Sequence, residues 1–336
     1  MRTTRLGRTN LQVTKTAFGA LPIQRVDFAT SDKILQRAFE AGIHFYDTAR
    51  GYSDSEEKIG HALSDVRQDI IIATKSPSRD KKGVLADIDT SLQKLKTDWI
   101  DVLQLHNPAH LPDPEDSDSA YAGLVEAKKQ GKIRFAGITC HKLTNALQAV
   151  KSGLYDTLQF PLSYLSSDEE LDLIRLCSQY DMGMIVMKAL SGGLITNATA
   201  AFGFFEQYSN AVPIWGIQRL SELEEFIALE ASPPVLDNAL QETILKDQEQ
   251  LKGSFCRGCG YCLPCPQDIA IPMSARMSLL IKRAPSAQFL EPDWQEKMKR
   301  IETCTECGQC KKRCPYELDI PEILKSELKK YKALLS

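Results

Sequence analysis

The stretch from residue 70 to residue 106, IIIATKSPSRDKKGVLADIDTSLQKLKTDWIDVLQLH, decides the fold. It begins with a short apolar, β-branched segment at 70–75, continues with a segment at 84–95 whose apolar residues are three and four positions apart, and ends with a second apolar segment at 100–106. The outer patterns are typical of buried strands and the middle one of an amphipathic helix. Because parallel strands need a crossover connection, the stretch predicts a βαβ unit.

The same alternation extends on both sides of this unit. It predicts eight strands, at residues 16–19, 44–48, 70–75, 100–106, 135–139, 157–160, 184–187 and 212–217. It also predicts helices at 31–41, 55–63, 84–95, 121–130, 143–150, 169–180 and 221–229, and a weaker one at 196–209. Eight such units favour an α/β fold closed into a (β/α)8 TIM barrel. A doubly wound sheet is the competing arrangement, but no G-x-G-x-x-G follows the first strand and there is no P-loop.

Length and composition favour two domains in an ordinary globular protein. A chain of 336 residues with 43% hydrophobic residues and a net charge of −3 has no charge surplus that would call for a nucleic-acid partner. Apolar runs are strand-sized, far below the roughly 20 residues of a membrane span, and the N-terminus has no apolar signal core. We therefore expect no membrane partner and a cytoplasmic location.

The distribution of cysteine predicts where the second domain lies. Eight of the ten cysteines fall between Cys256 and Cys314. In an enzyme-sized chain without a leader, such crowding favours a metal site over disulfides. We expect a barrel at 1–235, a bridging helix at 236–252 after Pro233-Pro234, and a small, mainly α domain at 253–336.

The cysteines form two runs that each end in Cys-Pro. The first is C-x2-C-x2-C-x2-C-P from Cys256 to Pro266, and the second is C-x2-C-x2-C-x3-C-P from Cys304 to Pro315. Gly258, Gly260 and Gly308 suit a backbone that turns tightly and donates N–H groups to sulfur. A pair of four-cysteine zinc knuckles is the alternative reading, although zinc is satisfied by two C-x2-C pairs and needs no triplets.

These runs resemble bacterial two-cluster ferredoxins, in which three cysteines of one run and the remote Cys-Pro of the other hold each 4Fe-4S cluster. The resemblance implies two sets of cluster ligands, namely Cys256, Cys259, Cys262 and Cys314 for one cluster and Cys304, Cys307, Cys310 and Cys265 for the other. The first run departs from the ferredoxin pattern, because two rather than three residues precede its Cys-Pro. This departure affects the assignment of Cys265 as a cluster ligand.

Chemistry in a TIM barrel takes place at the C-terminal ends of the strands. Asp47, Lys75 and His106 end the second, third and fourth predicted strands, and Tyr52 follows in the loop after the second. Each residue alone is more often structural than catalytic. As a group they are candidates for a site that moves a proton.

The surrounding motifs resemble the aldo-keto reductases over roughly residues 1–230. They are FYDTAxxY at 45–52, ATK at 73–75 and DxxQLH at 101–106, with LGRTxLxV at 6–13 and GKIRxxGI at 131–138. The resemblance implies reduction of a small carbonyl, or oxidation of an alcohol, with NADP(H) or NAD(H). Tyr52 would be the proton donor, Lys75 would stabilise its phenolate, Asp47 would position the lysine, and His106 would orient the substrate oxygen.

The resemblance also implies a nicotinamide site, with some departures. The residues that it places there are Thr139, Gln159, Lys188, Gly216, Gln218, Arg219 and Glu225. Arg219 favours NADP because it is able to bind a 2′-phosphate. Cys140, Met187 and Phe226 stand where the family usually has asparagine, an aromatic residue and asparagine.

The whole chain resembles a subgroup in which such a barrel is fused to a ferredoxin module. Since each cluster passes one electron and a nicotinamide transfers two as hydride, direct exchange would need a two-electron carrier; flavin is possible, but no motif supports it. The alternative function is electron transfer or redox sensing, with the nucleotide-binding barrel serving the clusters and an electron-transfer protein partner.

Overall fold

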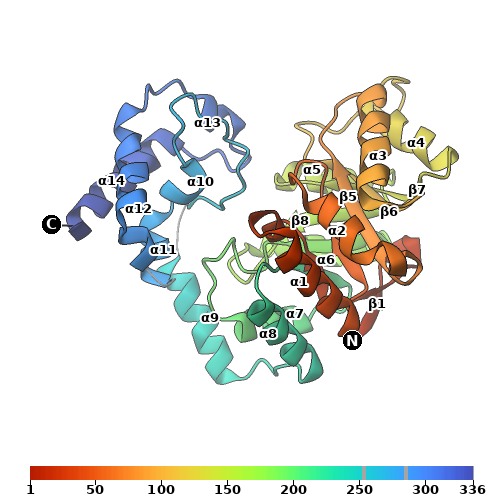
Figure 1. The fold of residues 1–336 in the computed structure, drawn as a ribbon, viewed down its shortest axis with the longest axis horizontal. Coiled ribbons are helices and arrows are strands. Elements are labelled where there is room, and N and C mark those ends of the chain that lie inside the picture. Colours follow the sequence, from red (N-terminus) through yellow and green to blue (C-terminus); the bar gives the residue numbers. More distant parts are fainter. Residues whose placement is uncertain (252–254, 284–286, 336) are drawn as a thin grey trace. The chain divides into compact units, whose positions relative to one another are not determined.

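The barrel is closed by eight parallel strands. The computed structural model describes residues 1–251, 255–283 and 287–335. The strands are β3 (Ala17–Gly19), β4 (Phe45–Asp47), β5 (Ile71–Ser76), β6 (Ile100–His106), β7 (Ile133–Thr139), β8 (Thr157–Pro161), β9 (Gly183–Met187) and β10 (Ala211–Gly216). They pair in sequence order and β10 returns to β3. Figure 1 shows β5 to β8 among the helices of the barrel. The predicted TIM barrel is confirmed, and closure rules out the doubly wound alternative.

Helices α1 to α7 connect successive strands of the barrel, and α8 follows the last strand. They are α1 (Phe28–Glu40), α2 (Ser55–Leu63), α3 (Lys81–Leu95), α4 (Ala120–Lys129), α5 (Leu143–Ser152), α6 (Asp168–Gln179), α7 (Ala198–Glu206) and α8 (Leu220–Ala231). Local sequence fixes several starts. Asp27 accepts a hydrogen bond from Thr30 N at the start of α1, and Ser167 with Glu170 forms a capping box at α6.

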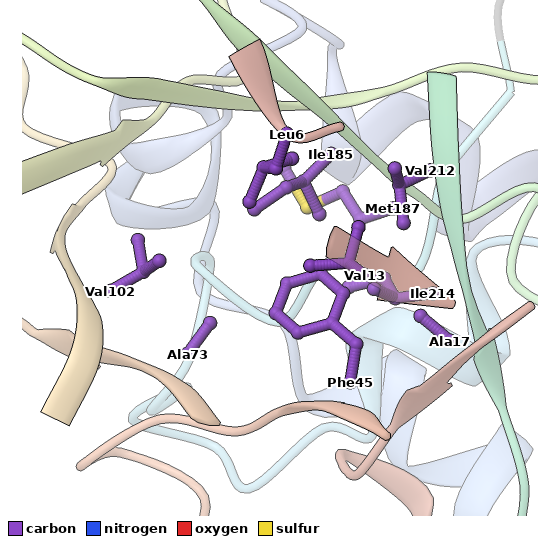
Figure 2. Packing of buried hydrophobic residues seen from close by; sticks show 10 residues of the cluster. All are labelled: Leu6, Val13, Ala17, Phe45, Ala73, Val102, Ile185, Met187, Val212 and Ile214. Atoms are coloured by element: carbon purple, nitrogen blue, oxygen red, sulfur yellow. The ribbon is translucent and has the colours of Figure 1, made fainter. Parts of the chain in front are cut away.

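An N-terminal hairpin that the sequence did not predict packs into the barrel core. Strands β1 (Thr3–Arg5) and β2 (Gln12–Thr14) pair antiparallel, and Leu6 and Val13 join the strand side chains of the core (Figure 2). Gly7 makes this approach possible, because its φ is +51° and a Cβ there would lie 2.2 Å from Gly183 N. The hairpin thereby contributes apolar area to the core.

A second compact unit contains the cysteine runs. It comprises Leu190–Ala198 and Gln241–Ser336, and the barrel unit comprises Met1–Ala189 and Thr199–Leu240. The helices after the barrel are α9 (Asn238–Gln250), α10 (Ile271–Ser274), α11 (Met277–Arg283), α12 (Pro292–Lys299), α13 (Gln309–Arg313) and α14 (Ile320–Leu335). None of the helices in the described part of the chain is long and apolar enough to span a membrane.

Long-range polar contacts hold α14 in the second unit. The buried Glu327 accepts hydrogen bonds from Ser278 N at 2.6 Å and Ser278 Oγ at 2.9 Å, at the start of α11. Tyr331 Oη donates to Phe289 O at 2.5 Å. These contacts give the cysteine runs a helical frame although the unit is small.

Candidate active site and cysteine site

Strand register places the candidate residues at one end of the barrel. Asp47 ends β4, Lys75 lies one residue before the end of β5, and His106 ends β6. Because β4, β5 and β6 are parallel neighbours, their C-terminal ends lie side by side. Tyr52 lies in the connection between β4 and α2 at the same end.

A buried ion pair stands at the centre of this group. Lys75 Nζ lies 2.6 Å from Asp47 Oδ2 and also donates to Thr48 O at 2.6 Å. Their side chains are 1% and 2% exposed. Gln104 Nε2 donates to Asp47 Oδ1 at 3.2 Å, and Gln159 Nε2 lies 3.5 Å from Asp47 Oδ2. The carboxylate thus has partners from three other strands of the barrel, β5, β6 and β8, which offsets part of its desolvation.

Tyr52 and His106 complete the group through ring contacts. The ring centroid of Tyr52 lies 5.1 Å from Lys75 Nζ and 5.9 Å from the centroid of His106, with an interplanar angle of 82°. Backbone hydrogen bonds from Tyr52 N to Ala49 O and from Arg50 N to Lys75 O hold the connection after β4. The structure therefore brings all four candidates into contact.

Burial controls the protonation of these groups. It raises the pKa of Tyr52, with a smaller contribution from the charge of Asp47. It lowers the pKa of His106 to about 3, with smaller contributions from Lys75 and Arg79, so the imidazole is neutral at physiological pH. Burial also raises the pKa of Asp47 and lowers that of Lys75, while each charge opposes the shift of the other.

This electrostatic picture differs from the expectation that Lys75 lowers the pKa of Tyr52. The ammonium lies over the ring at 5.1 Å from its centroid and is neutralised by Asp47 at 2.6 Å. A compact ion pair exerts little net field on a nearby phenol. Desolvation of the phenolate therefore prevails.

Two buried acceptors at the site fit an amide ligand. Gln159 Oε1 and Gln104 Oε1 are buried and have no hydrogen-bond partner among the residues that the structure describes. A buried acceptor left without a donor costs about 1–3 kcal/mol, so such atoms call for a bound donor. A nicotinamide carboxamide offers an N–H donor of this kind, and Gln159 is one of the residues that the family resemblance places at the nicotinamide site.

The other predicted residues on β7 and β9 have contacts of their own. Thr139 Oγ1 accepts a hydrogen bond from Asn107 N at 2.9 Å. Cys140 is 1% exposed, and burial raises the pKa of its thiol to about 12. Met187 belongs to the apolar core, and Lys188 follows β9 with a positive φ of 59°. Thus Thr139 and Lys188 stand at the C-terminal ends of strands, as expected for residues near a ligand.

The segment after β10 is more exposed than the ion-pair site. Gly216 ends β10, Gln218 Oε1 accepts a hydrogen bond from Arg25 at 3.4 Å, and the Arg219 side chain is 69% exposed at the start of α8. Glu225 is exposed on α8. Phe226 stacks on Trp215 at 4.5 Å between centroids, so it packs in the core where the family usually has a polar residue.

Sequence reasoning missed two supports of the site. Gln104 lies on the same face of β6 as His106, which follows two residues later. Because side chains on one face of a strand recur every two residues, this spacing could have identified Gln104 as a site residue. Glu56 is 1% exposed and accepts hydrogen bonds from Thr74 and Ser91 at 2.7 Å each, while it pairs with Arg50. A carboxylate on α2 carried no signal of this burial.

The eight cysteines of the two runs lie in the second unit. One cavity is lined by Cys262, Cys265, Cys304, Cys307 and Cys310. Cys262 and Cys265 of the first run thus lie at one cavity with the three cysteines of the second run. Burial raises the pKa of Cys256, the nearby Cys259 and Cys314 raise it further, and the Gly258 N–H and Arg276 oppose this. Cys256, Cys259 and Cys314 are therefore neighbours.

The arrangement suits a bulky cluster better than one metal ion. Among the described residues, no three His, Cys, Asp or Glu side chains converge as ligands of a single ion. A zinc ion needs four ligands within about 2.0–2.3 Å, whereas a cubane is bound by thiolates that stand around it. Gly258, with φ +62°, donates its N–H to Cys256 Sγ at 3.4 Å, as the sequence led us to expect.

The chain contains a closed parallel TIM barrel with a buried ion pair, a tyrosine and a histidine at its C-terminal mouth. The family model described as Aldo/keto reductase family matches residues 15–208, and the 4Fe-4S dicluster domain matches residues 255–319. The chain belongs to the aldo/keto reductase family and carries a C-terminal 4Fe-4S dicluster domain with eight cysteines.

Individual relatives agree with this assignment. The chain is 33% identical to L-galactose dehydrogenase of Arabidopsis thaliana over 211 residues, which are 57% of this chain and 66% of that protein, just under two thirds. Two solved structures share the fold. The aldo-keto reductase AKR11C1 of Bacillus halodurans in its holo form has a TM-score of 0.65 and 21% identity, covering 74% of this chain and 96% of its own. An aldo-keto reductase of Klebsiella pneumoniae in complex with NADPH has a TM-score of 0.62 and 18% identity, covering 73% and 94%.

Proposed function

We propose that the barrel reduces a small carbonyl compound, or oxidises the corresponding alcohol, with NADPH, and that the C-terminal domain holds two 4Fe-4S clusters. The observation that carries the proposal is the contact group of Asp47, Tyr52, Lys75 and His106 at the C-terminal mouth of the barrel. The similarity to a dehydrogenase and to NADPH-bound reductases supports both directions of the reaction.

Tyr52 donates the proton in the proposed reduction. When bound, the nicotinamide supplies a hydride to the carbonyl carbon, and the carbonyl oxygen becomes an alkoxide. An alkoxide is a stronger base than a phenolate, so a neutral phenol protonates it even when burial has raised the pKa of Tyr52. The Lys75 ammonium, paired with Asp47 beside the ring, offsets only a small part of the desolvation of the phenolate that remains.

His106 positions the carbonyl in this scheme. Since its pKa is lowered to about 3, the ring is a neutral donor that binds an oxygen without adding charge. The edge-to-face contact with Tyr52 fixes the angle between the two rings. A carbonyl oxygen placed between them meets a hydrogen-bond donor and a proton donor together.

Residues on the strand ends and on α8 would hold the nucleotide. Gln159 would bind the carboxamide through its unpartnered oxygen, with Thr139 nearby on β7. Lys188 and Gly216 would lie near the phosphates, and Gln218, Arg219 and Glu225 would meet the adenosine end. The 69% exposed Arg219 side chain is available for a 2′-phosphate, which favours NADPH over NADH.

Replacing Tyr52 by phenylalanine tests the proposal. With 4-nitrobenzaldehyde as the probe, we expect Tyr52→Phe to lower kcat by about 100-fold or more, since it removes the proton donor but keeps the ring. NADPH affinity, measured by fluorescence titration, should change less than twofold. The exposed Tyr180, on α6's C-terminal end, gives the matched control Tyr180→Phe. Undiminished turnover of Tyr52→Phe would overturn the assignment of the proton donor.

A further inference from the structure

The two cysteine sets differ in their access to solvent. Cys256, Cys262 and Cys314 are 6%, 7% and 9% exposed. In the other set, Cys307 is exposed and Cys304 is half-buried. The set that contains Cys307 is therefore the more accessible one. Since electron transfer between proteins requires close approach of the redox groups, this is the set that a partner protein is able to reach.

The enclosed set is sealed partly by an arginine. The Arg276 side chain is buried, and its guanidinium donates to Gly192 O at 2.8 Å and to Pro272 O at 3.0 Å. It packs so closely on Gly258 that a Cβ there would lie 2.8 Å from the guanidinium carbon. Residues of the second unit thus cover the backbone next to Cys256.

A hollow lined by lysines adjoins the accessible set. Its lining includes Cys304, Glu302, Glu306, Lys325, Lys329 and Lys332. The three lysines lie four and three positions apart on α14, so they share one face of the helix. They form the lysine face of the second unit.

The carboxylates of the hollow leave a positive surplus on the lysine face. Lys325 pairs with Glu306 at 2.6 Å and Lys332 with Glu302 at 2.5 Å. Lys329 is exposed, and no described residue forms an ion pair with it. From Lys299 to Lys332 the chain has nine lysines and arginines against six carboxylates, although its net charge is −3. A local positive field in a negative protein selects an acidic partner.

We propose that the lysine face is the docking surface for an acidic one-electron carrier protein, which exchanges electrons with the cluster of Cys265, Cys304, Cys307 and Cys310. The carrier loses one electron and this cluster gains it, so each docking event transfers one electron and forms no bond. The inference rests on the proposed clusters and adds the site and the chemistry of the partner.

Charge reversal at Lys329 tests the proposal in the full-length holoprotein. The probe is an acidic flavodoxin reduced to its hydroquinone, with binding measured by calorimetry and cluster reduction by stopped-flow absorbance without oxygen. We expect Lys329→Glu to weaken binding and slow second-order reduction by about fivefold at low salt, and to reduce the dependence of both on ionic strength. Lys129→Glu, an equal charge change at an exposed site on α4, should alter neither by more than about twofold.

Other outcomes separate the inference from the proposed function. Iron and acid-labile sulfide content is measured on each variant first, and an absence of clusters from the parent protein would overturn both proposals. If the clusters are intact and Lys329→Glu binds flavodoxin as tightly as the parent protein does, only the proposed docking surface is overturned. A third outcome is that the protein binds anionic phospholipid vesicles but not flavodoxin, and that Lys329→Glu abolishes the vesicle binding. This result would assign the lysine face to a membrane surface and would also overturn the proposed protein docking surface.

Discussion

The barrel and the cysteine unit hold their polar groups in different ways. In the barrel, Asp47 is bonded directly to Lys75 and Gln104, so the polypeptide itself satisfies the buried charge. In the cysteine unit, thiols line a cavity and no three of the described ligand-type side chains converge on a point. The charge of Asp47 is thus compensated by side chains of the barrel itself, whereas we expect the thiols of the cysteine unit to be held by the clusters that they bind.

The largest expected effect concerns the metal. We expect removal of iron by a chelator under reducing conditions to unfold much of the cysteine unit, because cluster binding contributes directly to the stability of so small a core. The barrel should remain folded and bind NADPH with unchanged affinity. Limited proteolysis with mass spectrometry would locate the cleavages, which we expect beyond Gln250.

The matched control for this experiment is the protein carried through the same steps without chelator. Cleavage inside the barrel strands would show that the two units depend on each other for stability. An unchanged cysteine unit would show that its helices are stable without a cluster.

The next effect concerns the ion pair of the barrel. Lys75→Met leaves Asp47 buried without its cation, and breaking a buried pair from one side costs about 3–5 kcal/mol. Urea unfolding of the barrel would measure this loss, together with turnover. We expect Asp47→Asn combined with Lys75→Met to recover most of the stability but none of the activity, since the double variant has no uncompensated charge and no ammonium.

Recovery of turnover in that double variant would contradict the role proposed for Lys75. A loss of stability below about 1 kcal/mol in Lys75→Met would show instead that water or a neighbouring group compensates Asp47.

The two regions also differ in what their sequences reveal. The barrel was predictable because a strand and helix period repeats eight times, and residues at strand ends such as Asp47 and His106 share one mouth in any barrel of this type. The hairpin that carries Leu6 and Val13 was not predicted, because its two short strands lie outside the repeated alternation of strands and helices that identified the others. In the cysteine unit the spacing identified the 4Fe-4S dicluster domain, but short helices such as α10 and α13 depend on tertiary contacts.

Local electrostatics at the site could not be predicted from the motifs. The motifs identify Lys75 and Tyr52. They do not give the distance of the ammonium from the ring or the burial of the phenol, and these two properties decide the direction in which the pKa of Tyr52 shifts. The support by Glu56 depends likewise on hydrogen bonds from Thr74 and Ser91, residues of other elements. Sequence patterns assign side chains to helices and strands, whereas the burial of a side chain depends on how those helices and strands pack together.

The smallest expected effect is a pH dependence of barrel stability due to His106. Its pKa is about 3 in the folded protein, mainly because of burial, and about 6.5 in the unfolded chain. Below about pH 6.5 the unfolded state binds a proton that the folded state excludes, so the free energy of unfolding falls as pH decreases toward 3. The slope due to one proton is at most about 1.4 kcal/mol per pH unit.

Urea unfolding of His106→Gln at pH 7.5, 6.0 and 5.0 would measure this contribution. We expect the variant to lose less stability than the parent between pH 6.0 and 5.0, because glutamine takes up no proton in either state. Replacement of the exposed His110 by glutamine is the control and should leave the slope unchanged. An identical slope in His106→Gln and the parent would mean that the folded and unfolded states take up this proton alike, and the lowered pKa of His106 would have to be abandoned.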